Sequence, residues 1–216
     1  MLDRDEIYTA GPSPVPSEPL VRFALEHAGD EVVDLGCGFG SYSARLQEAR
    51  KRVIGVDSDP AFVEEARSRG VDAVVADVRA TPFDDRSFDT AILFEVLEHI
   101  PQPESVLREA LRIVRRNVLV SVPNFGEFGH LRDYGLTYWH VAVTDHVNFF
   151  TPEGLRNVAR SAGGAADVIL SEPLEPFGLV PSRGPAWYVL AVLRRAGLIR
   201  PAAFFRLYAV VRHADA

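Results

Sequence analysis

Short apolar runs alternate along the chain with longer segments in which apolar residues recur every three or four positions. The short runs are rich in β-branched residues and predict buried strands, whereas the longer segments have the spacing of amphipathic helices. Strands are expected at Glu31–Leu35, Arg52–Val56, Ala73–Val75, Asp89–Phe94 and Val118–Val122. Helices are expected at Leu20–Ala28, Ser41–Arg50, Pro60–Arg69 and Glu104–Arg115. Strands that alternate with helices predict an α/β fold with a parallel sheet covered by helices on both faces.

The C-terminal part of the chain has a less regular pattern. Thr151 is a suitable N-cap and Pro152 a suitable first residue for a further helix. A strand is expected at Asp167–Leu170 and a helix near Pro185–Ala196. The final apolar run, Ala202–Arg212, fits either a last strand or a helix.

The length of 216 residues is enough for one α/β domain with a sizeable core. Four prolines between Pro12 and Pro19 predict an extended lead-in, so residues 1–29 are expected to form a lead-in and a first helix. Residues 30–216 are expected to form the main domain. Aromatic residues and glycines crowd the segment after the fifth strand, so residues 124–151, together with 171–200, are expected to form a lid or insert over the substrate.

The charge balance favours a small-molecule partner. A net charge of −7 gives no basic footprint, which argues against a nucleic-acid partner. The single cysteine, Cys37, excludes an internal disulfide and a cysteine-based zinc site. No basic start precedes an apolar stretch, and no uninterrupted apolar run reaches the length of a membrane span. We therefore expect a cytoplasmic protein, a monomer or homodimer, without stable membrane insertion.

Three glycines spaced two apart, Gly36, Gly38 and Gly40, follow the first strand and directly precede a helix. Glycine lets the backbone turn sharply and approach a ligand closely, so the loop predicts a site for a nucleotide or a nucleoside-bearing cofactor. A dinucleotide fingerprint would place glycine where Ser41 stands, which argues against an NAD-dependent oxidoreductase. Asp34 before the loop would repel an anionic ligand and attract one with an ammonium group. S-adenosylmethionine is such a ligand.

Two further acids occur at or near the ends of the second and third strands. Asp57 can accept hydrogen bonds from both hydroxyls of a ribose, and Ser58 beside it is a further candidate for the cofactor site. Asp77 can accept from an exocyclic adenine amine, with the backbone N–H of Val78 beside it. Each acid alone could instead cap a helix. Three acids at consecutive strand ends favour a ligand site, because ligands of open α/β sheets bind there.

The stretches VVDLGCGFG, VIGVDSDP, VVADVRATPF, FDTAILFEVLEHI and VLVSVPN follow in this order over the first five strands. They resemble the class I S-adenosylmethionine-dependent methyltransferases, in particular the type 11 and type 23 groups. The resemblance implies a Rossmann-like, doubly wound sheet of seven strands whose last strand is antiparallel. It also implies methyl transfer from S-adenosylmethionine, held by Asp34, Gly36 and Gly38 at its methionine portion, Asp57 at the ribose and Asp77 at the adenine.

The stretch FEVLEHI places two carboxylates and an imidazole close together. If the chain turns helical after the fourth strand, Glu95, Glu98 and His99 share one face and could hold Mg²⁺, Mn²⁺ or Zn²⁺. The E-x-x-E-H element resembles that of ubiquinone-biosynthesis O-methyltransferases and of small-RNA 2′-O-methyltransferases. In the RNA enzymes this element and a later histidine bind a metal, which implies the set Glu95, Glu98, His99 and His146.

A metal-free site is the alternative. His99, His140 or His146 would then be the general base, or His146 would be a structural anchor. Glu98 and His99 could also simply orient the loop beside the cofactor, and Glu95 is a further candidate for the cofactor site. The predicted acceptor is a small molecule methylated on oxygen. Transfer to nitrogen or carbon, a metal-dependent RNA 3′-terminal 2′-O-methyltransferase and a noncatalytic S-adenosylmethionine-binding protein remain alternatives.

Overall fold

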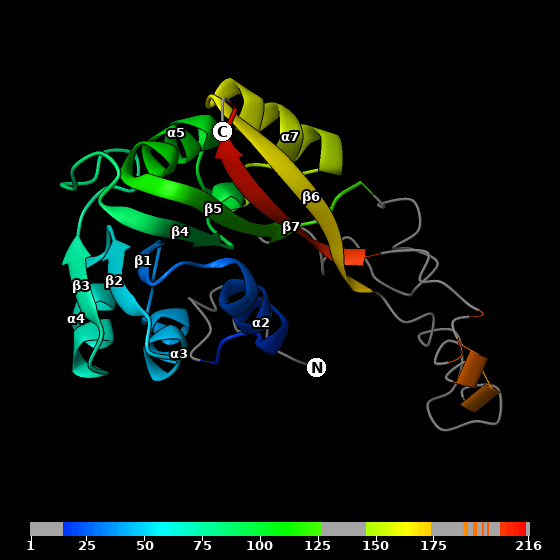
Figure 1. Ribbon diagram of the computed structural model, residues 1–216, viewed down its shortest axis with the longest axis horizontal. Coiled ribbons are helices and arrows are strands. Elements are labelled where there is room, and N and C mark those ends of the chain that lie inside the picture. The colour runs from blue at the N-terminus through cyan, green and yellow to red at the C-terminus, as the bar shows by residue number, and fades with distance from the viewer. Residues whose placement is uncertain are drawn as a thin grey trace.

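The computed structural model describes residues 15–126, 146–173 and 204–214, with a few isolated residues between 188 and 198. Most of the predicted lead-in, much of the two predicted lid segments and most of the helix predicted near Pro185–Ala196 lie outside the described residues. The described part forms one sheet with helices on both faces (Figure 1).

The sheet has the strand order β3-β2-β1-β4-β5-β7-β6. β1 to β5 run parallel, whereas β7 is antiparallel to both of its neighbours, β5 and β6. The predicted seven-stranded, mostly parallel fold is therefore confirmed, and the last apolar run is a strand. The strands are β1 (Glu31–Leu35), β2 (Arg52–Asp57), β3 (Asp72–Val75), β4 (Phe88–Phe94), β5 (Val114–Pro123), β6 (Gly164–Pro173) and β7 (Phe204–His213).

The helices begin close to where their caps predict. The Asp59 carboxylate accepts from the Ala61 N–H and the Thr151 hydroxyl from the Gly154 N–H, so both side chains cap a helix. The helices are α2 (Glu18–His27), α3 (Ser41–Glu48), α4 (Pro60–Ser68), the 3₁₀ turn η1 (Leu97–His99), α5 (Pro103–Ile113) and α7 (Pro152–Ser161). Among the described residues, none of these helices is long and apolar enough to cross a membrane.

Two predicted helices end two residues earlier than expected. The helix expected to reach Arg50 ends at Glu48. The helix expected to reach Arg115 ends at Ile113, and Val114 already pairs with Phe88 as the first residue of β5. Arg115 then reaches across the sheet edge to ion pairs with Glu31 and Asp89. Pairing with a neighbouring strand thus overrides a helical spacing that continues past the true helix end.

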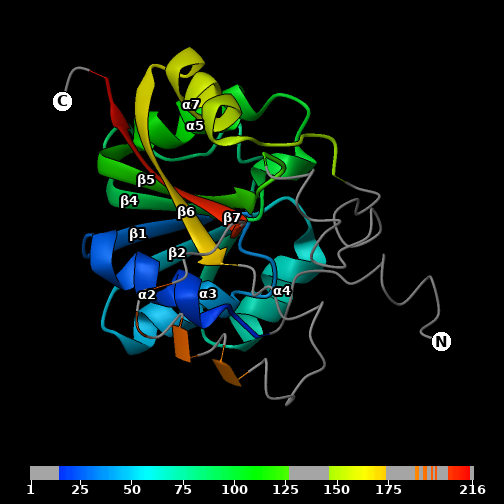
Figure 2. The same ribbon diagram turned by 90° about the vertical axis from the view of Figure 1, so that its right-hand side faces the viewer.

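Side chains that alternate along each strand divide the core into two layers. Val33 and Leu93 pack with α5 and α7 on one face, while Val32 and Ile92 pack with α2 and α3 on the other. The two views agree on this arrangement, with α5 and α7 on one side of the sheet and α2, α3 and α4 on the other (Figure 2). The carboxyl ends of β1 to β5 therefore meet along one edge, which also carries the glycine loop and η1.

Candidate functional site

All three loop glycines adopt the left-handed conformation. Their φ angles are 80° at Gly36, 51° at Gly38 and 73° at Gly40. The N–H groups of Gly36 and Cys37 both donate to the carbonyl of Val56, which draws the loop over the end of β2. A β-carbon on Gly36 would lie 2.6 Å from Cγ2 of Val96. The loop predicted from the glycine spacing therefore requires glycine both for its φ and for its close packing.

Asp34 lies beneath this loop and is 2% exposed. Its carboxylate accepts a hydrogen bond of 2.6 Å from the Ser43 hydroxyl at the start of α3. Burial raises the pKa of Asp34 to about 6, even though the Ser43 hydrogen bond favours the charged form. Ser43 was not expected from the sequence. The one feature of the sequence that could have indicated Ser43 is its position in the first turn of the helix that follows the glycine loop.

Asp57, the last residue of β2, faces the glycine loop. One carboxylate oxygen accepts from the Gly38 N–H at 2.9 Å and the other from the Asp59 N–H at 3.0 Å. Each oxygen keeps a further lone pair for a hydroxyl group, as the predicted ribose contact requires. Ser58 beside it is exposed at the same edge.

Asp77 lies just beyond β3, which ends at Val75. Its side chain is exposed and forms an ion pair of 2.6 Å with Arg79. Hydrogen bonds from the Arg79 guanidinium hold the pKa of Asp77 below its usual range. Val78 next to it is buried. The sequence did not predict Arg79 at this place, and a ligand at Asp77 would have to displace it or bind beside it.

Glu95 points toward β5 and β7. Its backbone has a φ of 57°, unusual for a residue with a side chain. Its carboxylate accepts from the Ser121 hydroxyl at 2.7 Å and forms an ion pair of 3.2 Å with Arg206. Arg206 also pairs with Glu172 of β6, so β4, β5, β6 and β7 are joined by one polar network.

The expected helical face after β4 is therefore wrong. The chain makes only the short turn η1, and Glu95 precedes it in a left-handed conformation. Its carboxylate is engaged by Ser121 and Arg206 and does not join the group of side chains formed by Glu98 and His99.

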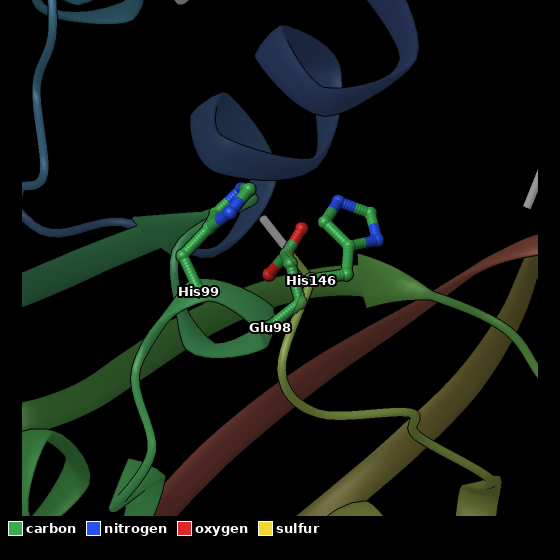
Figure 3. A group of neighbouring side chains, drawn as sticks. All are labelled: Glu98, His99 and His146. Carbon is green, nitrogen blue, oxygen red and sulfur yellow. The ribbon is translucent and has the colours of Figure 1, made fainter. Parts of the chain in front are cut away.

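Glu98, His99 and His146 do come together. Each offers one ligand atom, and the three atoms lie within 4.8 Å of one another. The two imidazole rings meet edge to face with their centroids 4.8 Å apart. Figure 3 shows the Glu98 carboxylate between the two rings, and this residue is only 1% exposed. One carboxylate and two imidazoles fit a divalent cation such as Zn²⁺ or Mn²⁺, and they equally form an acid–base group. We call these three residues the Glu98 cluster. His140 and Asp145, the other candidates from this region, lie outside the described residues.

The strand order, the glycine loop and the acids at the strand ends together define an α/β domain built to bind a nucleoside-bearing cofactor at one edge of its sheet. Comparison with known proteins narrows this class. Residues 33–122 match the family model described as a methyltransferase domain. Over residues 33–122 the chain is therefore similar to methyltransferase domains, in agreement with the resemblance of its motifs to the class I S-adenosylmethionine-dependent methyltransferases.

Three individual proteins illustrate the likeness. A probable S-adenosylmethionine-dependent methyltransferase of Mycolicibacterium smegmatis is 34% identical over 123 residues, covering 55% of this chain and 48% of that relative. A ubiquinone biosynthesis O-methyltransferase of Xanthomonas oryzae pv. oryzae is 33% identical over 102 residues, covering 44% and 43%. The chain spans about half the length of these relatives. A solved S-adenosylmethionine-dependent methyltransferase from Archaeoglobus fulgidus shares the fold, with a TM-score of 0.66 and 18% identity over 96% of each chain.

Proposed function

We propose that this protein is an S-adenosylmethionine-dependent methyltransferase that methylates a hydroxyl oxygen of a small molecule. The observation that carries the proposal is the Glu98 cluster, which stands at the same sheet edge as the glycine loop. Hydroxyl groups are poor nucleophiles at neutral pH, so O-methylation needs a group that removes or acidifies the proton. The name of the Xanthomonas oryzae relative, an O-methyltransferase, supports the same acceptor.

The glycine loop fits the cofactor. Its glycines leave room for a ligand at close range, and the Gly38 N–H fixes the Asp57 carboxylate beside the loop. Asp57 would hold the ribose hydroxyls, Asp34 would favour the cationic methionine portion, and Asp77 and Val78 would contact the adenine. When bound, S-adenosylmethionine supplies a sulfonium methyl whose transfer forms a C–O bond while the C–S bonding electrons remain on sulfur.

The chain's own task is to align the acceptor and take its proton. His146 is half-buried beside the buried Glu98, so a neutral imidazole there can accept the hydroxyl proton while the carboxylate stabilises the resulting cation. His99 is exposed, and its ring lies on the other side of the Glu98 carboxylate from His146 (Figure 3).

The same three side chains also form a ligand set for a divalent cation. Such an ion would lower the pKa of a hydroxyl bound to it, and His146 would then be a ligand instead of a base. Chelator treatment separates these two uses. Activity that survives chelation supports the base, and activity that is lost and then restored by Mg²⁺, Mn²⁺ or Zn²⁺ supports the ion.

Two aromatic side chains, Phe125 and Phe149, favour a substrate with an apolar ring or chain. The rings of Phe125 and Phe149 stack edge to face at 4.7 Å, and Phe149 is 56% exposed although its side chain is large and apolar. Phe149 lies three residues after His146 in a segment whose preceding residues are rich in aromatic side chains. An aromatic pair in which the Phe149 ring is exposed, three residues from His146 in the chain, can pack against a ring of the substrate.

The experiment is a transfer assay with S-adenosylmethionine labelled on its methyl group. Acceptors would include catechols, simple phenols and hydroxy acids, with matched amines and thiols in parallel. We expect label in a methyl ether or ester, and S-adenosylhomocysteine in equal amount. Label found only on nitrogen, sulfur or carbon would contradict the proposal, as would tight cofactor binding without transfer to any member of the panel.

A further inference from the structure

The segment that carries His146 has no regular secondary structure, and yet it is tied closely to η1. The N–H groups of Val147 and Asn148 both donate to the carbonyl of Glu98, at 2.8 and 3.0 Å. These bonds run to the backbone of the same residue whose carboxylate belongs to the Glu98 cluster. The position of His146 relative to Glu98 therefore depends on how residues 147 and 148 dock on this turn.

The Asn148 side chain adds two further hydrogen bonds to this attachment. Its amide nitrogen donates to the carbonyl of Leu97 at 2.9 Å and to the carbonyl of Ile100 at 2.5 Å. Both N–H groups of the side-chain amide are thus used, and the two carbonyls flank Glu98 and His99 in the sequence. The Leu97 carbonyl already accepts the Ile100 N–H of the turn at a long 3.4 Å, so the Asn148 amide adds a second, shorter hydrogen bond there. The same amide also supplies a donor to the Ile100 carbonyl at the end of the turn.

The other end of the segment is anchored separately. Phe150 is 4% exposed, its carbonyl accepts from the Phe125 N–H at 2.8 Å, and it forms a bridge with Asn124 at the end of β5. His146 lies four residues before this anchor, a distance over which an extended chain can span about 13 Å. The Phe150 anchor alone would therefore leave His146 free to swing, whereas Asn148 lies only two residues from it.

We propose that Asn148 is a positioning residue that holds His146 against Glu98 and His99. The role of Asn148 in methyl transfer rests on the proposed function, whereas its role in docking residues 146–148 on η1 does not. Asparagine suits the place because it offers two donors on a short, uncharged side chain. An aspartate of nearly the same shape would present oxygens to both carbonyl oxygens and donate to neither.

The matched pair of variants is Asn148→Asp and Asn157→Asp. Asn157 is exposed on α7, where the same chemical change leaves the Glu98 cluster untouched. Asn148→Ala is made as well, because it removes both donors without adding a charge and serves if Asn148→Asp does not fold. Folding is checked by circular dichroism, and cofactor affinity by titration with S-adenosylmethionine.

The deciding readout is the NMR cross-relaxation between ring protons of His99 and His146 in histidine-labelled protein, assigned with single histidine variants. Ring centroids 4.8 Å apart place ring protons within its range. We expect the cross-peak in the parent protein and in Asn157→Asp, and its loss in both Asn148 variants. Methyl transfer should fall about 10- to 100-fold in the Asn148 variants, with cofactor affinity within about twofold of the parent.

A cross-peak that survives in Asn148→Ala, or one that is absent from the parent, overturns the inference. If no hydroxyl acceptor is methylated by the parent, the proposed function fails. The cross-peak still decides whether Asn148 docks the segment, so the two failures are distinguishable.

Discussion

Replacing Gly36 with alanine probes the link between the glycine loop and the turn that follows β4. The residue has a φ of 80°, and a β-carbon would lie 2.6 Å from Cγ2 of Val96. Val96 is the N-cap of η1, so a displacement of Val96 would also displace the turn that carries Glu98. Gly70 is a matched control, because its φ is 83° and nothing lies within 4 Å of its would-be β-carbon.

The two substitutions share one cost and differ in another. A left-handed conformation costs a residue with a β-carbon about 1–2 kcal/mol, which both variants carry. Overpacking against Val96 adds about 1–3 kcal/mol to Gly36→Ala alone. The free energy of unfolding should therefore fall by about 1–2 kcal/mol in Gly70→Ala and by about 2–5 kcal/mol in Gly36→Ala.

Urea unfolding at neutral pH measures the free energies, and calorimetric titration with S-adenosylmethionine measures binding. We expect cofactor affinity to fall at least about tenfold in Gly36→Ala, equivalent to about 1.4 kcal/mol, and to stay unchanged in Gly70→Ala. Equal losses of stability in the two variants would refute the close packing against Val96. Parent-like cofactor affinity in Gly36→Ala would refute the place of the loop in the cofactor site.

Three further outcomes are expected. The pKa of Asp34 is raised to about 6 from an ordinary 3.8, so the folded state binds the Asp34 proton more tightly than the unfolded state does. The contribution of Asp34 to the free energy of unfolding should therefore fall by up to about 3 kcal/mol as pH rises from about 4 to 6. Asp34→Asn should remove that slope in urea titrations across this range, and an unchanged slope would contradict the burial argument. Arg206→Met removes the cationic partner of two half-buried carboxylates and should cost about 3 kcal/mol in urea unfolding. The control is Arg156→Met, in which the lost arginine side chain is 41% exposed; it should cost under about 1 kcal/mol, and equal effects would refute the network's role. If the Glu98 cluster binds an ion, Zn²⁺ or Mn²⁺ should raise the melting temperature of the parent protein but not that of Glu98→Gln. The control Glu64→Gln, at an exposed position, should respond as the parent does, and a parent that does not respond would exclude the ion.

The geometry of the proposed cofactor site could be predicted from local sequence. Three glycines after a buried strand demand positive φ in a tight turn, and Gly36, Gly38 and Gly40 all have it. Asp57 was expected at the end of the second strand, and it stands there facing the loop. These features depend on residues that are close in the chain and on the order of the strands. The pattern of apolar residues predicts both.

The other half depends on contacts between distant segments. The spacing of Glu95, Glu98 and His99 suits a helix, but nothing in a glutamate signals that Glu95 adopts a φ of 57°. Its partner Arg206 stands on β7, which inserts between β5 and β6 and is far from Glu95 in the chain. Such long-range pairing has no local signature, so the ligand set predicted from spacing included a carboxylate that the fold uses elsewhere.

The central claim is that the Glu98 cluster acts on the methyl acceptor. It is tested most directly by the single-turnover rate of methyl transfer in His146→Gln, compared with the parent and with His213→Gln. His213 ends β7 at the opposite edge of the sheet and is a matched control. We expect a fall of about 100-fold or more in His146→Gln with unchanged cofactor affinity, and a parent-like rate in His213→Gln. A parent-like rate in His146→Gln would contradict it.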